Sequence, residues 1–271
     1  MVLVGKAPIA ELSNFFRTKN KIYAKMSYLN PSGSIKDRVV LKILQKAMKE
    51  GKIGGVIEAT SGNTGISLAF WANFFGIKAT IVIPKGMSEE RKRMAKLLGA
   101  EVIEVEGDFD ASIKLAKKIA REKRLFYLGQ FSREENPRAY YSLAKEMEKL
   151  KIDYFVAGVG TGGTLIGVAR VLKKKGVKII GVLPKEREHG IQGIGDWVKS
   201  RFWDEKLVDE IYRVSTKEAR RYMRKLWKAG FLVGISSGAN IKAALHYAES
   251  GNVGTVFPDS WDRYLSVEGG D

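Results

Sequence analysis

Cysteine is absent from the 271 residues of this chain, and histidine occurs only twice, as His189 and His246. The first absence excludes disulfide bonds, thiolate metal ligands and a cysteine nucleophile. The second argues against a histidine metal centre or a histidine-dependent triad, so no metal site is expected. No apolar run approaches membrane-spanning length, and no secretory signal peptide opens the sequence. We therefore expect a cytoplasmic protein without a membrane partner.

Acidic residues are few beside basic ones, since 30 Asp and Glu accompany 47 Lys and Arg, for a net charge of +17. This charge raises the question of a nucleic-acid partner. The basic residues are, however, scattered along predicted helices with acidic residues interleaved, as in segments 89–93 and 217–225. Amides are scarce as well. Such a surface is typical of a thermophile protein, and we expect no nucleic acid to bind.

Strand-like apolar runs alternate with helical patterns, which indicates an α/β fold with mostly parallel twisted sheets flanked by helices. The charged segment 131–136, which leads into Pro137, is the best candidate for a domain boundary. The predicted strands are 22–25, 55–59, 79–84, 101–105, 125–128, 154–158, 178–183 and 253–257. The predicted helices begin near Ser34, Thr64, Ser88, Phe109, Asn136, Gly163, Thr216 and Gly238, with Ser88 and Thr216 as candidate N-caps.

Lys36 follows a turn of Pro, Gly and Ser and opens an apolar helix, an unusual place for a surface charge. An amine held at the mouth of a site loses solvation, which lowers its pKa and makes it a nucleophile toward carbonyl groups. Most lysines at helix starts are merely solvated. Two loops further along the chain help to decide between a reactive lysine and an ordinary solvated one.

Two glycine-containing loops follow predicted strands and open helices. Thr60–Gly65 combines glycines with hydroxyls and an amide, and helix N-termini of this kind favour anions. Gly158–Thr164 matches the dinucleotide pattern G-x-G-x-x-G, but that pattern expects an acidic residue at the end of the next strand. Here the next strand ends in Leu183, Pro184 and Lys185. A single phosphate therefore fits this loop better than a dinucleotide. Gly234–Ala239 and Pro258–Ser260 are further small-residue turns.

Taken in order, these motifs resemble the pyridoxal-phosphate enzymes of fold type II, specifically the cysteine synthase (O-acetylserine sulfhydrylase) and cystathionine β-synthase family. The resemblance spans nearly the whole chain. The motifs that carry it are Asn30–Arg38, Thr60–Gly65, Gln130–Phe131 with Asn136–Pro137, Gly160–Thr164, Gln192–Gly195, Ser236–Gly238 and Pro258–Ser260.

The resemblance implies pyridoxal 5'-phosphate as cofactor and a role for each motif. Lys36 matches the lysine that forms an aldimine with the cofactor and moves the substrate α-proton. Asn63 matches the partner of the phenolic oxygen, and Ser236 matches the serine that faces the ring nitrogen. The phosphate cup corresponds to Gly160, Thr161, Gly162, Gly163 and Thr164. The grip on the substrate α-carboxylate corresponds to Thr60, Ser61, Asn63, Thr64 and Gln130, with Gly193, Gly195 and Asp196 beside the substrate side chain.

The family resemblance also implies a two-domain enzyme and a homodimer. The smaller, mobile domain that binds the substrate carboxylate is expected over residues 21–134, and the larger, cofactor-binding domain over 1–20 and 135–271. The expected reaction is β-replacement on an activated serine, with sulfide as nucleophile, to give L-cysteine through a bound aminoacrylate. A serine at the ring nitrogen favours this reaction over transamination, because a ring that need not be protonated is a weaker electron sink.

Two departures from the family pattern leave the acceptor open. Trp261 and Asp262 follow Pro258–Ser260, where the family usually has Gly-Glu or a similar pair. Asp196 and Trp197 follow Gly195, where cysteine synthases usually have small residues. A carboxylate at Asp196 would repel a phosphate leaving group by about 3 kcal/mol at 5 Å and an effective dielectric near 20. The alternatives are a serine-using sulfhydrylase or cystathionine synthase, a cysteine desulfhydrase or serine dehydratase, and, outside the enzymes, a basic protein that binds phosphate or nucleic acid.

Overall fold

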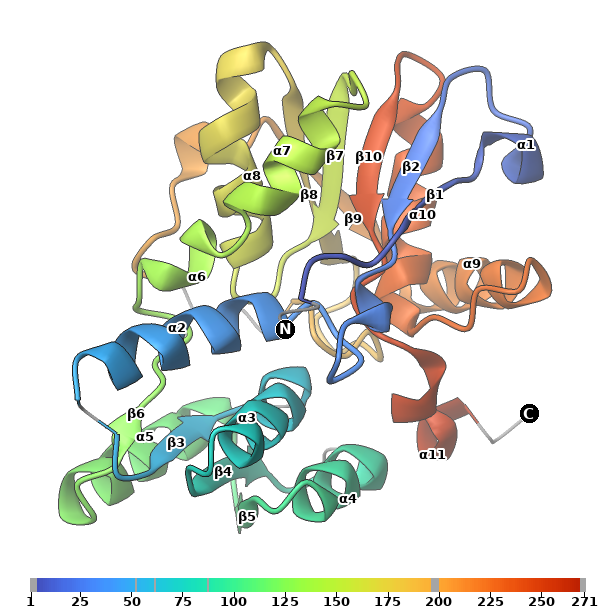
Figure 1. The fold of residues 1–271 in the computed structure, drawn as a ribbon. Coiled ribbons are helices and arrows are strands. Elements are labelled where there is room, and N and C mark those ends of the chain that lie inside the picture. Colours follow the sequence, from blue (N-terminus) through green and yellow to red (C-terminus); the bar gives the residue numbers. More distant parts are fainter. Residues whose placement is uncertain (1–3, 52, 61, 87, 196–199, 269–271) are drawn as a thin grey trace. The chain divides into compact units, whose positions relative to one another are not determined.

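The chain forms two compact α/β units in the computed structural model, which describes residues 4–51, 53–60, 62–86, 88–195 and 200–268 (Figure 1). The larger unit comprises residues 1–35 and 131–261, and the smaller unit residues 36–130 and 262–271. The sequence suggested a smaller domain over 21–134. The smaller unit begins at residue 36 and not at residue 21, because strand β2 (Ile22–Lys25) is hydrogen-bonded into the sheet of the larger unit.

The larger unit is built on a six-stranded sheet in the order β1-β2-β10-β7-β8-β9. Only β1 (Ile9–Glu11) runs antiparallel to its neighbour. The other strands are β7 (Tyr154–Gly158), β8 (Lys178–Pro184), β9 (Glu210–Val214) and β10 (Val253–Val256). Six of the seven residues of β8 are buried, as expected for a central strand of a parallel sheet.

Helices join these strands and cover the sheet (Figure 1). They are α1 (Ser13–Phe16), α6 (Glu135–Arg138), α7 (Tyr141–Glu148), α8 (Gly163–Leu172), α9 (Thr216–Lys228) and α10 (Ile235–Tyr247), with short 3₁₀ turns at Ser27–Leu29, Lys173–Lys175 and Glu205–Leu207. Helices α9 and α10 pack closely at Gly238, where an added Cβ would lie 2.0 Å from the carbonyl oxygen of Ala219. Gly238 therefore belongs to a helix interface, not to the turn that the sequence suggested.

The smaller unit holds a four-stranded, fully parallel sheet in the order β5-β4-β3-β6. Its strands are β3 (Val56–Ala59), β4 (Ala79–Pro84), β5 (Glu101–Val105) and β6 (Phe126–Tyr127). Its helices are α2 (Asp37–Lys49), α3 (Asn63–Phe74), α4 (Glu89–Leu97), α5 (Phe109–Glu122) and α11 (Leu265–Glu268), and the 3₁₀ turn Trp261–Arg263 leads into α11. The α/β class and the mostly parallel sheets confirm the fold predicted from the sequence.

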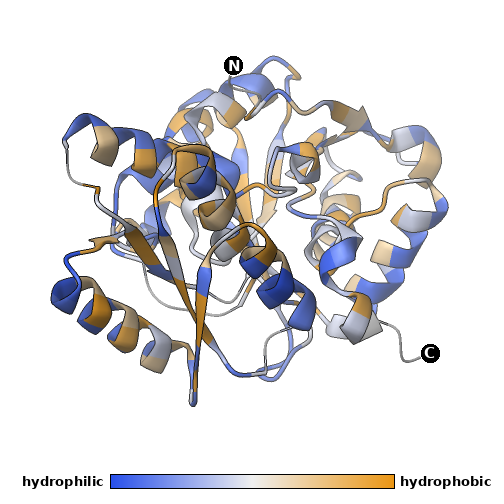
Figure 2. Ribbon diagram, turned by 60° about the horizontal axis from the view of Figure 1, so that its bottom comes forward, coloured by the Kyte–Doolittle hydropathy of each residue, from blue (hydrophilic) through white to orange (hydrophobic). Residues whose placement is uncertain are grey.

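Apolar packing between α5 and the sheet forms the core of the smaller unit. Ile57, Ala59 and Val82 of the strands contact Ala116 and Ala120 of α5. In Figure 2, hydrophilic and hydrophobic residues alternate along the helices, as they do in amphipathic helices that cover a sheet. Among the described residues, no helix has the length and apolar character needed to cross a membrane.

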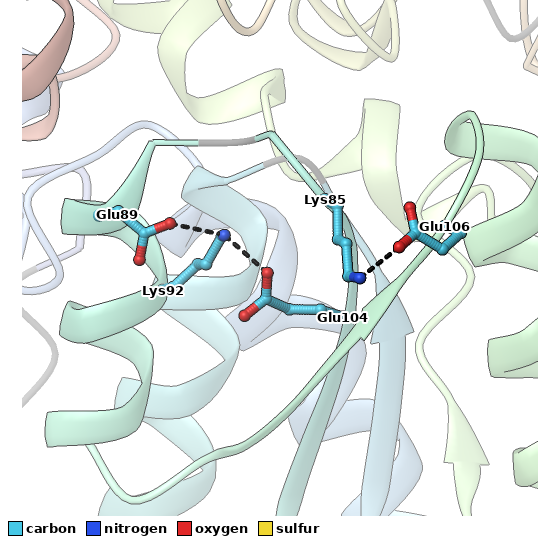
Figure 3. Close-up of polar contacts among 5 residues, drawn as sticks. All are labelled: Lys85, Glu89, Lys92, Glu104 and Glu106. Carbon is cyan, nitrogen blue, oxygen red and sulfur yellow. Dashed lines mark hydrogen bonds and ion pairs between the residues drawn. The ribbon is translucent and has the colours of Figure 1, made fainter.

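A cluster of ion pairs lies at one end of β4 and β5 in the smaller unit (Figure 3). Lys92 Nζ of α4 donates to Glu89 Oε1 and to Glu104 Oε2, each at 2.7 Å. Lys85 pairs with Glu106 beside it. Lys92 is the buried member of this cluster, and its pKa is raised, chiefly by the hydrogen bond to Glu104.

Candidate active site

Lys36 lies at the N-cap position of α2, where its carbonyl accepts hydrogen bonds from Val39 N and Val40 N at 3.1 and 3.0 Å. It is half-buried, and the helix that follows buries one apolar side, so this end of α2 is held in place. Asp37 holds it further, because its carboxylate is completely buried and bound by side chains of α3. The predicted anchor lysine thus stands on a rigid element.

The Thr60–Gly65 loop joins β3 to α3, which begins at Asn63. Thr60 Oγ1 accepts from Gly62 N at 3.1 Å, which shapes the turn. The Thr64 hydroxyl donates to Gln130 Oε1 at 2.7 Å. Three residues predicted to grip the substrate carboxylate, Thr60, Thr64 and Gln130, are therefore brought together in the smaller unit. Ser61 lies outside the described residues.

The Gly160–Thr164 loop joins β7 to α8, and its glycines are required by close packing. A Cβ at Gly160 would lie 2.4 Å from the carbonyl oxygen of Gly193, and one at Gly163 would lie 1.9 Å from Asn136 Oδ1. Gly162, the N-cap of α8, has a φ of +79°, in the left-handed region that favours glycine. No bulky side chain would fit here without moving its neighbours.

Neighbouring segments support this loop in the larger unit. Asn136 Nδ2 donates to Thr161 Oγ1 at 3.2 Å, and the Ser200 hydroxyl donates to the carbonyl of Thr161. Gly195 N donates to Val159 O at 2.9 Å, which brings the predicted substrate loop, Gly193 to Gly195, beside the predicted phosphate cup. Asp196, the next residue of that loop, lies outside the described residues.

Ser236 lies in the first turn of α10 and is buried. The sequence suggested a helix starting near Gly238; the structure starts it at Ile235, so Ser236 belongs to a helix N-terminus. Backbone bonds tie this end to the Pro258–Ser260 turn, since Gly234 N donates to Asp259 O at 3.0 Å. Ile35 N, directly before Lys36, donates to Pro258 O at 2.8 Å. The Ser236 region and the residue preceding Lys36 are thus joined through one turn.

The three helices behind the predicted loops share an electrostatic feature. Helices α3, α8 and α10 have no acidic residue in the first turn and a glycine, which has no side chain, at the N-cap. At α8 one amide is already bound, since Gly163 N donates to Thr161 Oγ1 at 3.3 Å. Elsewhere, α5 is capped by Asp108 and α9 by Ser215, which forms a capping box with Glu218. An uncapped N-terminus offers backbone N–H groups and a favourable dipole to an anion. The glycine cradle at the start of α8 therefore fits the phosphate dianion of pyridoxal phosphate.

The sequence as a whole is similar to known enzymes with this chemistry. Residues 1–259 match the family described as "Pyridoxal-phosphate dependent enzyme". The chain belongs to this family. A protein from Staphylococcus aureus named cysteine synthase is 37% identical over 98% of this chain and 94% of its own length. A Bacillus subtilis protein named O-acetylserine dependent cystathionine beta-synthase is 38% identical over 98% of this chain and 95% of its own length.

Solved structures of such proteins share the fold. The Entamoeba histolytica cysteine synthase superposes with a TM-score of 0.92 at 36% identity, over 98% of this chain and 88% of that one. The O-acetylserine dependent cystathionine beta-synthase from Helicobacter pylori superposes with a TM-score of 0.91 at 37% identity, over 97% of this chain and 95% of that one. Membership of the family, dependence on pyridoxal phosphate and the fold type II architecture, as predicted, are confirmed.

Two charged residues of this pyridoxal-phosphate dependent enzyme were missed by the sequence analysis. Glu58 lies fully buried in β3 and binds the backbone of Gln130. Arg91 is buried against the Thr60–Gly65 loop, where a Cβ at Gly62 would lie 2.5 Å from its Nη1, and its Nη2 donates to Tyr264 OH at 3.0 Å. The sequence does contain a signal for Glu58, which is a charged residue inside an apolar strand. It contains none for Arg91, because Arg91 lies among other basic residues of a helix.

Proposed function

We propose that this pyridoxal-phosphate dependent enzyme is a cysteine synthase, which replaces the β-substituent of an activated serine with sulfide. The observation that carries the proposal is the extent of the similarity. Relatives named for cysteine synthesis and for O-acetylserine chemistry match 98% of the chain. Membership of an enzyme family also decides against a protein that only binds phosphate or nucleic acid.

The residues of the chain take the following roles in this proposal. Lys36 Nζ anchors the cofactor and moves the substrate α-proton. The amides of Gly160–Thr164 hold the phosphate, Asn63 orients the ring and Ser236 offers a neutral partner to its nitrogen. The substrate α-carboxylate binds to Thr60, Ser61, Thr64 and Gln130. When bound, the cofactor supplies the electron sink that labilises the α-proton and the β-substituent.

These roles rest on chemistry that the described residues provide. A phosphate dianion is stabilised by backbone N–H groups and a helix dipole without a charged side chain. Hydroxyl and amide groups bind a carboxylate and exclude water when the loop closes on it. A cytoplasmic homodimer with a smaller substrate-binding domain and a surface adapted to high temperature belongs to the same proposal.

A second candidate function has a specific observation in its favour. Two of the proteins that match this chain are named O-acetylserine dependent cystathionine beta-synthase. In that reaction a thiol amino acid replaces sulfide as the nucleophile, while the first half of the reaction is unchanged. Since both candidates use the same amino-acid acceptor, the nucleophile distinguishes them.

The test is a panel of acceptors and nucleophiles. We expect the purified protein to absorb visible light, and borohydride to bleach it and to fix the cofactor to Lys36. With sulfide, kcat/KM is expected to be higher for O-acetylserine or serine than for O-phosphoserine. Lys36→Ala is expected to abolish turnover and leave the fold intact. A colourless protein that cannot be reconstituted, or full turnover in Lys36→Ala, contradicts the proposal.

Homocysteine in place of sulfide tests the second candidate, and Asp196→Asn tests the acceptor preference. If Asp196 disfavours a phosphate leaving group, the neutral variant should gain kcat/KM for O-phosphoserine and not for O-acetylserine. If wild type prefers O-phosphoserine and this preference is unchanged in Asp196→Asn, Asp196 does not determine the choice of acceptor.

A further inference from the structure

Glu58 is a fully buried carboxyl group in a strand that is otherwise apolar. It stands at the third position of β3, with none of its surface exposed. Burial of a carboxylate costs several kcal/mol unless hydrogen bonds compensate. The hydrogen-bond partners of Glu58 therefore indicate the role of its buried carboxylate.

Both carboxylate oxygens of Glu58 bind backbone amides. Oε1 accepts from Ala59 N at 3.0 Å, and Oε2 accepts from Gln130 N at 3.1 Å. The amide of Gly129 and the side chain of Tyr127 also donate to it. Glu58 therefore holds the end of β3 to the segment that follows β6.

Hydrogen bonds of the Gln130 side chain connect it in turn to the Thr60–Gly65 loop. Its Oε1 accepts from the Thr64 hydroxyl at 2.7 Å, and its Nε2 donates to Ala59 O at 3.2 Å. Thr64 is the second residue of α3, directly after Asn63. A continuous path of hydrogen bonds thus runs from Glu58 through Gln130 to Thr64, and each of these three side chains is buried.

We propose that Glu58 is a positioning residue whose ionised carboxylate fixes Gln130 in the conformation that binds the substrate α-carboxylate. The inference rests on the proposed function, which assigns Gln130 and Thr64 to that carboxylate. An ionised carboxylate accepts strongly at both oxygens, whereas protonation makes one oxygen a hydroxyl donor and a much weaker acceptor. The ionised form therefore holds Ala59 N and Gln130 N together more strongly than the protonated form.

The surroundings of Glu58 place its ionisation in the working range of pH. Burial raises the pKa of Glu58 to about 7, against the lowering effect of the amides of Gln130, Gly129 and Ala59 and of the Tyr127 hydroxyl. Among the elements packed on β3, neither β4 nor α3 contains an ionisable residue, and the ionisable residues of α5 are exposed. Tyr127 on β6 faces Glu58, and Lys117 Nζ of α5 lies 6.0 Å from the centre of its ring.

The consequence is a binding step that depends on pH. As the pH falls through about 7, Glu58 takes up a proton, and the protonated oxygen holds its backbone amide donors less strongly. Affinity for the amino-acid substrate should fall with it. Loss of a hydrogen bond to a charged group corresponds to a weakening on the order of tenfold.

The test uses the complete enzyme with its cofactor and compares wild type with Glu58→Gln between pH 5.5 and 8.5. In wild type, the ¹⁵N–¹H signal of Gln130 should titrate with a midpoint near 7, and KM for the amino acid should rise below it. In Glu58→Gln the titration should vanish, KM should rise on the order of tenfold, and kcat should change little. Glu101→Gln, an exposed carboxylate on β5, is the matched control and should behave as wild type.

Two further variants distinguish a failure of the positioning role from a failure of the proposed carboxylate site. Tyr127→Phe removes one donor and should shift the midpoint upward, which tests the inference even if Glu58→Gln folds poorly. Gln130→Ala tests the proposed assignment of Gln130 to the substrate α-carboxylate, on which the inference rests. If Gln130→Ala leaves substrate affinity unchanged, the proposed carboxylate site fails. If Gln130→Ala weakens binding while Glu58→Gln does not, or if the Gln130 signal does not titrate in wild type, the positioning role is overturned and the proposed function stands.

Discussion

Asp37 Oδ1 accepts a 2.6 Å hydrogen bond from the Ser67 hydroxyl, and the same oxygen accepts from Trp71 Nε1 at 2.9 Å. Asp37 opens α2 directly after Lys36, and the two donors lie on α3, which begins at Asn63. One buried carboxylate oxygen therefore ties together the helices that carry the predicted anchor lysine and the predicted partner of the cofactor ring.

Asp37→Ala is expected to lower the free energy of unfolding by about 3 kcal/mol, because two buried donors lose their acceptor. Asp37→Asn keeps one acceptor oxygen and should cost less. Trp71→Phe, which removes a single donor, is the matched control. Denaturant unfolding measures the stabilities. An Asp37→Ala variant as stable as wild type would show that the two helices are held together by apolar packing alone.

Gly163→Ala tests the cradle at the start of α8. The added Cβ would lie 1.9 Å from Asn136 Oδ1, so Asn136 must move and its hydrogen bond to Thr161 must break. We expect a loss of about 1–3 kcal/mol in stability and at least a tenfold weaker affinity for pyridoxal phosphate. Gly54→Ala is the control, since a Cβ there meets no atom within 4 Å. Absorbance titration with the cofactor gives the affinity, and equal affinities in both variants would contradict the cradle.

Much of this architecture could be read from the sequence, because strands of a parallel sheet are continuous apolar runs. Strands β2, β4, β5 and β7 lie at the predicted residues. The edge strands β1 and β9 of the larger unit were not predicted, whereas β5, an edge strand of the smaller unit with similarly exposed residues, was. The pairing with a neighbour that defines an edge strand is not shown by a local pattern.

Helices α5, α8 and α9 begin at the predicted residues, but the helix caps were predicted less well, for a different reason. Thr216 was the expected cap of α9, but the cap is Ser215, whose hydroxyl accepts from Glu218 N at 3.2 Å. Ser88 is at the N-cap of α4 as expected, yet its hydroxyl donates to Arg263 O, from the distant C-terminal segment. Composition identifies the loops that are predicted to carry chemistry. The partners of Glu58 and Arg91 depend on tertiary contacts and cannot be read from spacing.

The ion pairs of Figure 3 predict a contribution of Lys92 to stability. Lys92 is only 6% exposed and bridges Glu89 and Glu104, so both pairs are lost in Lys92→Gln. We expect the melting temperature to fall by roughly 2–4 °C. Arg93→Gln, an exposed residue of the same helix, is the matched control and should leave it unchanged.

The effect of Lys92→Gln should depend on pH and on salt. The pKa of Glu104 is lowered, chiefly by its hydrogen bond to Lys92, so the pair contributes at neutral pH and its contribution is lost as the pH falls through the lowered pKa of Glu104. The difference between wild type and Lys92→Gln should therefore shrink in acid. An effect independent of pH would indicate that the apolar stem of Lys92, and not its charge, stabilises the helix.

Ser236→Asp tests the residue proposed to face the ring nitrogen. Ser236 is buried in the first turn of α10, where the dipole favours a negative charge, so the variant is expected to fold. A carboxylate at this point favours a protonated ring nitrogen, which strengthens the electron sink and prolongs the carbanion-like stage of the reaction. We expect slower β-replacement and a longer-lived visible band after substrate is added, measured by stopped-flow absorbance. Ser236→Ala, which removes the hydroxyl without adding charge, should show no such band. Identical transients and rates in wild type and Ser236→Asp would place Ser236 away from the ring nitrogen.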